Sequence, residues 1–153
     1  LAVEEIEGIL YRMGIGEHIA PEPLQGQVVA IKRWLQARWP DAKAYVELPV
    51  RRIRESGQIV QGRTDLVLRT ETGWILIDHK STPQGSSQWQ SLADQYAGQL
   101  SGYQEVLEAA SGIPVEETWL LLPVAGAALR LEINAELETA RTVQPGTAAQ
   151  PNA

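Results

Sequence analysis

Two short apolar runs joined by a Thr-Gly turn restrict the fold of this chain more than any other feature. Residues 62–80 read Gly-Arg-Thr-Asp-Leu-Val-Leu, then the turn, then Trp-Ile-Leu-Ile-Asp-His-Lys. A hairpin of this kind brings Asp65 and Asp78 to the same end. Because side chains alternate along a strand, Asp78 and Lys80 lie on one face. The segment therefore predicts a β-hairpin with two carboxylates and an ammonium at one edge of a sheet.

These three side chains suit a divalent cation held beside a scissile phosphate. Hydrolysis of a phosphodiester needs an activated water and a countercharge, and bound Mg²⁺ or Mn²⁺ supplies both. Mg²⁺ takes one or two carboxylates and keeps waters for its other positions. We therefore expect Asp65 and Asp78 to bind the metal, and Lys80 to position the attacking water and offset phosphate charge. The alternative is that the aspartates cap turns and the lysine is solvated.

The composition limits the classes of protein and of metal site. The 153 residues suit one domain, and 44% hydrophobic with 21% charged residues is ordinary for a soluble globular protein. No apolar run approaches a membrane span and no signal peptide opens the chain, so we expect a cytoplasmic protein without a membrane partner. The chain has no cysteine and two histidines, which excludes thiolate sites and disfavours zinc.

The ends and the charge of the chain indicate part of a longer protein. The first residue is leucine, and residues 142–153 are rich in Pro, Gly, Ala and Gln. We therefore expect a domain over residues 1–141, cut from the C-terminal part of a longer chain, and a disordered tail over 142–153. The net charge of −6 argues against non-specific DNA binding by this piece alone.

Hydrophobic periodicity predicts an α/β fold. Helices and strands alternate in a way that favours a mixed central sheet of about four to five strands flanked by helices. The expected helices are 3–13, 24–39, 92–110 and a short one at 136–141, and the expected strands are 44–54, 59–69, 74–80, 115–123 and 127–133.

Three motifs in this order resemble the PD-(D/E)XK superfamily of nucleases. They are Gly62-x-x-Asp65, Asp78-x-Lys80 and Gln99-x-x-x-Tyr103. The resemblance is to the RecB- and AddA-type nuclease domains that are fused to UvrD/Rep-like helicases, and it covers roughly residues 24–133. It implies a restriction-endonuclease-like core, whose order of elements matches the order expected above.

The resemblance also implies a function and a set of partners. It implies a metal-dependent deoxyribonuclease using Mg²⁺ or Mn²⁺, and an exonuclease of a helicase–nuclease in bacterial DNA end processing and recombinational repair. The implied partners are DNA, the helicase portion of the parent chain and a second helicase–nuclease subunit. A catalytically idle module of the same fold, which only guides DNA, is the alternative. The complete Asp65, Asp78 and Lys80 set favours the active enzyme.

Further residues take roles from the resemblance. The metal ligands are Asp65, Asp78 and the backbone carbonyl of His79. Gln99 and Tyr103, which are four apart and share a helix face, contact the DNA backbone at the edge of the site. Their alternative is an ordinary polar stripe on an amphipathic helix.

Some positions keep two interpretations. Glu47 supports the site or binds a second metal, or it is an exposed glutamate of an edge strand. The family carries a histidine on its first helix in a Gly-x-x-x-His motif; His18 has this spacing from Gly14, but the surrounding glycine and proline predict a loop. This departure favours the idle module.

Trp89 either stacks on an unpaired base or anchors the loop after the hairpin to the core. An arginine cluster on the first two predicted strands either binds phosphates or makes the outer face soluble. The cluster consists of Arg51, Arg52, Arg54 and Arg63.

Overall fold

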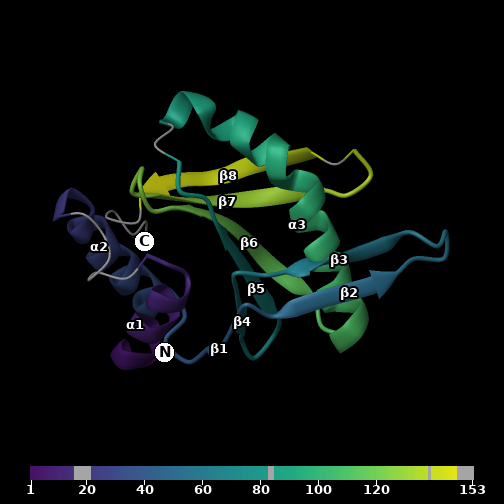
Figure 1. Ribbon diagram of the computed structural model, residues 1–153, viewed down its shortest axis with the longest axis horizontal. Coiled ribbons are helices and arrows are strands. Elements are labelled where there is room, and N and C mark those ends of the chain that lie inside the picture. The colour runs from purple at the N-terminus through teal and green to yellow at the C-terminus, as the bar shows by residue number, and fades with distance from the viewer. Residues whose placement is uncertain (16–21, 83–84, 138, 148–153) are drawn as a thin grey trace.

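A six-stranded mixed sheet forms the centre of the molecule (Figure 1). The computed structural model describes residues 1–15, 22–82, 85–137 and 139–147. The strand order is β1-β4-β5-β6-β7-β8; β5 and β6 are parallel and the other neighbours antiparallel. The strands of this sheet are β1 (Lys43–Val46), β4 (Leu66–Arg69), β5 (Trp74–His79), β6 (Val115–Leu122), β7 (Ala127–Asn134) and β8 (Thr139–Thr147).

Helices cover both faces of this sheet, which confirms the predicted mixed α/β arrangement. Two helices, α1 (Val3–Arg12) and α2 (Glu22–Arg38), lie on one face, and α3 (Trp89–Ser111) crosses the other (Figure 1). A short 3-10 helix, η1 (Ser86–Gln88), precedes α3. Gly112 ends α3 with a φ of 71°, a left-handed conformation that favours glycine. Within the described residues, no helix is long and apolar enough to cross a membrane.

Two hydrophobic cores hold the layers together. The core under α1 and α2 contains three tryptophans that meet edge to face, with ring centroids 4.9 to 6.1 Å apart. They are Trp34, Trp39 and Trp119. The core under α3 combines aliphatic residues of the helix with those of β4 to β8. Asp78 shares the face of the sheet that packs on α3, because it alternates with Ile77, which packs on the opposite side.

The predicted strands 44–54 and 59–69 each break into two, and only one half of each, β1 and β4, belongs to the central sheet. The outer halves, β2 (Pro49–Ile53) and β3 (Ile59–Arg63), pair only with each other and project from the sheet as a hairpin (Figure 1). The break is built from hydrogen bonds: Thr64 donates to Leu48 O from both its N–H (3.0 Å) and its hydroxyl (3.1 Å). Glu47, with a φ of 53°, turns the chain at the same level.

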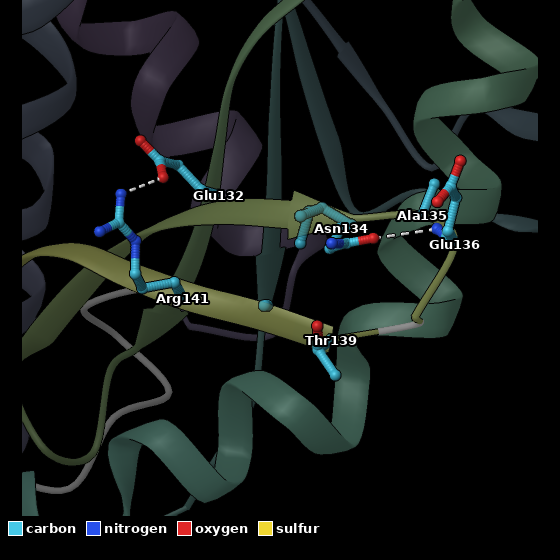
Figure 2. A pocket seen from close by; sticks show the side chains of 8 residues that line it. Glu132, Asn134, Ala135, Glu136, Thr139 and Arg141 are labelled. Atoms are coloured by element: carbon cyan, nitrogen blue, oxygen red, sulfur yellow. Dashed lines mark hydrogen bonds and ion pairs between the residues drawn. The ribbon is translucent and has the colours of Figure 1, made fainter.

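The predicted helix at 136–141 is wrong, because residues 136 and 137 lie in a turn and β8 begins at Thr139. Residues 142–147, assigned to a disordered tail, also belong to this strand, and residues 148–153 lie outside the described part. The physical reason is the neighbouring strand: Ala127, Ala128 and Leu129 of β7 are buried in succession, so β7 needs a partner on its outer side. Asn134 closes the turn, since its Oδ1 accepts the N–H groups of Glu136 and Leu137, both at 3.1 Å. Figure 2 shows the bond to Glu136.

Candidate active site

Asp65 and Asp78 meet at one end of the β4–β5 hairpin, as the sequence predicts. The register pairs Leu66 with Ile77, so Asp65 and Asp78 are the next residues outward on the two chains. Both lie on the same face as Leu76, whose side chain packs in the core under α3. The two carboxyl groups are therefore brought together between the sheet and α3.

His79 holds Asp65 in place. The carboxylate oxygen Asp65 Oδ2 accepts the backbone N–H of His79 at 2.9 Å and lies 2.8 Å from the imidazole Nδ1. Since a carboxylate only accepts, this contact places the proton on Nδ1. Sequence reasoning gave His79 a role only through its backbone carbonyl and missed its side chain. The available signal was the hairpin register, which makes His79 the next residue along the chain from Asp78, the residue opposite Asp65.

Lys80 approaches the second carboxylate. Its Nζ lies 3.2 Å from Asp78 Oδ2 and 4.3 Å from the ring centroid of Tyr96 on α3. Asp78 is 4% exposed, and its Oδ2 forms no hydrogen bond of acceptable geometry within the described part of the chain. The contact with Lys80 is therefore an ion pair only. Tyr96 is the α3 residue that contacts the lysine.

The two carboxyl groups differ in pKa because they lie close together in a partly buried place. Burial raises the pKa of Asp78 to about 7, and the neighbouring Asp65 adds to this increase. Burial also acts to raise the pKa of Asp65, but hydrogen bonds from His79 outweigh it and lower that pKa to about 2. The pair thus releases its protons in two well-separated steps. As pH rises through about 7, Asp78 ionises and the pair gains its second negative charge.

We expect Asp78→Asn, in a chelator and without divalent metal, to stabilise the folded protein at about pH 8 and much less at about pH 5. The folded pKa of Asp78 is raised above 3.8 to about 7. Between pH 3.8 and about 7, the folded protein keeps a proton on Asp78 that the unfolded chain has released. The free energy of unfolding of the wild type therefore decreases as pH rises through this range. Asparagine is neutral at every pH and removes this loss. Urea titrations at the two pH values measure the free energies of unfolding.

Asp41→Asn is the matched control, because Asp41 is exposed in the turn before β1. It should change the stability little at either pH. The lowered pKa of Asp65 acts in a different range, since its stabilising contribution is lost only as pH falls from 3.8 toward about 2. A gain for Asp78→Asn that is equal at both pH values would contradict the assignment of this titration to Asp78.

The donor set fits a hard divalent cation. Two carboxylates converge, and one buried oxygen, Asp78 Oδ2, lacks a hydrogen bond within the described part of the chain. Among the described residues, no group of three or more His, Cys, Asp or Glu gathers as a metal site. Mg²⁺ binds through one or two carboxylates and keeps several waters, so the pair suits it better than it suits zinc.

Gln99 and Tyr103 lie on α3 beside the base of the projecting hairpin. Gln99 Nε2 donates to the Tyr103 hydroxyl at 3.1 Å, and Tyr103 is buried in the core under α3. A Cβ on Gly62 would come within 2.7 Å of that hydroxyl, so glycine permits the close approach of β3 to the helix. In the described residues, no hydrogen bond joins Gln99 or Tyr103 to the carboxylate pair.

The remaining candidates are placed less centrally. Glu47 is exposed, and its backbone N–H donates to Asp65 O at 3.0 Å, so its main chain is adjacent to the site. Trp89 is half-buried and packs against the core under α3, as the core-anchor interpretation predicts. His18 lies outside the described residues.

A separate hollow of about 620 Å³ opens at the β7–β8 turn (Figure 2). Its walls include Asn134 and Thr139, together with an ion pair between Glu132 and Arg141. None of its lining residues belongs to the predicted site. The hollow and the carboxylate pair are therefore distinct features of the surface.

A known protein family and several curated relatives match this sequence. Residues 9–152 match the family model of the PD-(D/E)XK nuclease superfamily. A curated relative from Desulforudis audaxviator (strain MP104C), named as an ATP-dependent helicase/nuclease subunit, is 30% identical over 110 residues, or 67% of this chain and 9% of that protein. A protein of the same name from Oceanobacillus iheyensis is 33% identical over 66 residues, covering 40% of this chain and 5% of the relative. The chain thus spans less than a tenth of the length of these relatives.

Among solved structures, the chain titled "Crystal structure of SSO0001" is similar, with a TM-score of 0.44 and 19% identity over 86% of this chain and 61% of that one. The mixed sheet with helices on both faces is consistent with the restriction-endonuclease-like core that the motifs imply. Because the family model extends from residue 9 to residue 152, the chain belongs to the PD-(D/E)XK nuclease superfamily.

Proposed function

We propose that this chain is a divalent-metal-dependent deoxyribonuclease domain that hydrolyses phosphodiester bonds. The observation that carries the proposal is the convergence of Asp65, Asp78 and Lys80 at one end of the β4–β5 hairpin. The matched relatives are named as parts of helicase/nucleases, which supports a nuclease acting beside a helicase portion. We further propose that it acts as an exonuclease. We assign it to DNA end processing and recombinational repair in the bacterial cytoplasm. A further partner in this role is a second helicase–nuclease subunit.

Asp65 and Asp78, with the backbone carbonyl of His79, would hold Mg²⁺ or Mn²⁺. The metal would supply an activated water and neutralise charge on the phosphate. The protein contributes preorganisation: His79 fixes Asp65 through two contacts to one oxygen. Ionisation of Asp78 adds the second negative charge that favours cation binding.

Lys80 provides a positive charge beside the place of reaction. The Tyr96 ring and the Asp78 carboxylate both contact its ammonium, so the charge is held between the sheet and α3. A fixed cation stabilises the negative charge that develops on a phosphate in the transition state, and costs little reorganisation when the reaction occurs. The lysine can also orient the attacking water.

Titration calorimetry should detect Mn²⁺ binding to the wild-type chain and lose it in Asp78→Asn. Asparagine removes a charge that the cation needs but keeps the shape of the side chain. The exposed Asp41→Asn change serves as the matched control and should bind Mn²⁺ as the wild type does. Equal heats for wild type and Asp78→Asn would place the metal elsewhere.

A cleavage assay separates the active enzyme from the idle module. We expect the wild-type chain with Mg²⁺ to shorten a labelled DNA strand, and both a chelator and Asp78→Asn to stop it. Mn²⁺ binding without cleavage of any single-stranded or duplex DNA would support the idle alternative instead.

Gln99, Tyr103 and Glu47 are proposed as accessory residues. Gln99 is exposed one turn beyond Tyr96, the ring under Lys80, and the Tyr103 hydroxyl orients its amide. An amide donates to a phosphate oxygen without adding charge beside the metal. We expect Gln99→Ala with Tyr103→Phe to weaken DNA binding and cleavage while Mn²⁺ affinity is kept. Unchanged cleavage by the double variant would make the pair a structural contact between α3 and β3.

A further inference from the structure

The projecting β2–β3 hairpin has two different faces. Side chains alternate along each strand, so Val50 and Val60 point toward α3, where both contact the core. Arg52 and Arg54 share this inner face and form ion pairs with Glu105 of α3, at 4.0 and 2.8 Å. The side chains of the inner face therefore bind the hairpin to α3.

The outer face is exposed along its whole length. Six exposed residues make up what we call the outer hairpin face: Pro49, Arg51, Ile53, Ile59, Gln61 and Arg63. Arg51 and Arg63 are diagonal neighbours across the hairpin. Within the described residues, neither forms an ion pair, in contrast to the two arginines of the inner face.

An apolar pair lies at the far end of the same face. Ile53 and Ile59 are directly opposite each other in the register, and they are 62% and 50% exposed. An exposed aliphatic pair at the tip of a hairpin has no role in this chain's own core. It is suited to contact with a partner.

Charge identifies the kind of partner. Residues 49–63 contain four arginines and one glutamate, a net charge of +3 in a chain whose total is −6. The rest of the molecule is thus strongly acidic and repels a phosphate backbone, whereas this hairpin attracts it. A DNA strand fits both parts of the face, because arginines contact phosphates and apolar side chains pack against bases.

The base of the hairpin fixes the position of the outer hairpin face relative to the carboxylate pair. Arg63 is two residues from Asp65, and Thr64 between them is fixed by its two hydrogen bonds to Leu48 O. The Tyr103 ring packs against Gly62 from the helix side. A strand bound to the hairpin would therefore be held in a constant position relative to Asp65.

We propose that the outer hairpin face is the DNA-binding surface of this domain. Arg51 and Arg63 contact the phosphate backbone next to the site, and Ile53 and Ile59 pack against bases at the tip. The proposal deepens the proposed nuclease function and rests on it for the identity of the ligand.

The test is the binding of a fluorescein-labelled single strand and of the corresponding duplex by the 153-residue chain, in a chelator so that no cleavage occurs. Arg51→Gln with Arg63→Gln should weaken binding to both. For the single strand, log affinity decreases with log salt. The steepness of this decrease should become smaller by about 1.4, since two phosphate contacts are lost at roughly 0.7 each. Ile53→Ser with Ile59→Ser should weaken binding without changing this slope, because no charge is removed.

Arg12→Gln with Arg33→Gln is the matched control. It removes the same charge from exposed positions on α1 and α2, across the sheet from α3, and should keep the wild-type slope. All substituted side chains are exposed, so equal melting temperatures are expected and are checked. If the hairpin and control variants bind DNA equally, the proposal is overturned. It is also overturned if the wild-type chain self-associates in sedimentation and the isoleucine variant does not, because the face then binds protein.

A cleavage assay with Mg²⁺ distinguishes failure of this inference from failure of the proposed function. If the chain is a nuclease, Arg51→Gln with Arg63→Gln should raise KM and leave kcat nearly unchanged, since the contacts hold substrate and transition state alike. A wild-type chain that never cleaves refutes the nuclease function, yet the difference in DNA binding still tests the hairpin. A fall in kcat at unchanged KM would overturn the binding role.

Discussion

Lys80→Ala is expected to slow single-turnover DNA cleavage by about 10²-fold or more, with little change in Mn²⁺ affinity. The ammonium lies 3.2 Å from Asp78 Oδ2, where the metal and the phosphate would meet. Loss of one preorganised electrostatic group in such a place typically costs about two to three orders of magnitude in rate. Rates are measured with enzyme in excess over a labelled strand, so that DNA affinity and product release do not limit them.

Lys43→Ala is the matched control for this prediction. Lys43 also belongs to the central sheet, and its Nζ lies 5.4 Å from the Tyr45 ring, much as Lys80 lies over Tyr96. Lys43 begins β1, at the opposite end from Asp65, so Lys43→Ala should cleave DNA at the wild-type rate. A Lys80→Ala chain that cleaves as fast as Lys43→Ala would reduce Lys80 to an ion-pair partner of Asp78.

Trp119→Ala is expected to lower the free energy of unfolding by about 3 to 5 kcal/mol. Trp119 is 3% exposed, and its ring meets those of Trp34 and Trp39 at 4.9 and 6.1 Å. Its Nε1–H also donates to Glu117 at 3.0 Å. The change therefore leaves a large cavity under α2 and removes one hydrogen bond to Glu117, whose carboxylate still pairs with Arg38 at 3.2 Å. Since small domains are stable by only about 5 to 15 kcal/mol, much of this chain should be unfolded at moderate urea.

Urea titration followed by circular dichroism measures the decrease in the free energy of unfolding. Two further variants serve as comparisons. Trp119→Phe keeps an aromatic ring and should cost clearly less than Trp119→Ala. Tyr11→Ala removes a ring that is 67% exposed on α1, and its effect should stay within about 0.5 kcal/mol. If Trp119→Ala were no more costly than Tyr11→Ala, the three-tryptophan cluster would not contribute to the stability of the core.

Local pattern determined most of the secondary structure. Apolar residues at helical spacing placed α1 and α2, and the long amphipathic run placed α3, because their buried stripes are visible in sequence. The Thr-Gly turn set the register of β4 and β5, which brings Asp65 and Asp78 to one end. Alternation then set Lys80 on the same face as Asp78.

The sequence predictions were wrong where pairing between distant segments determines the secondary structure. Residues 44–54 and 59–69 alternate as continuous strands. Pro49 favours an edge or a bulge but does not place the break at Glu47 and Thr64. Thr64 leaves the ladder because it bonds Leu48 on another segment, and this contact exists only after the two segments pair. Residues 139–147 become a strand for a similar reason, since β7 supplies the partner that a Pro- and Gly-containing segment cannot specify alone.

The sequence by itself determined which residues can hold a metal and a phosphate, and that Asp65, Asp78 and Lys80 come together, because one hairpin contains all three. Only the tertiary structure decided how the three are held. The imidazole of His79 fixes Asp65, and the Tyr96 ring, from a distant helix, contacts Lys80. The raised pKa of Asp78 has the same origin, since burial under α3 and the nearness of Asp65 arise only when sheet and helix pack.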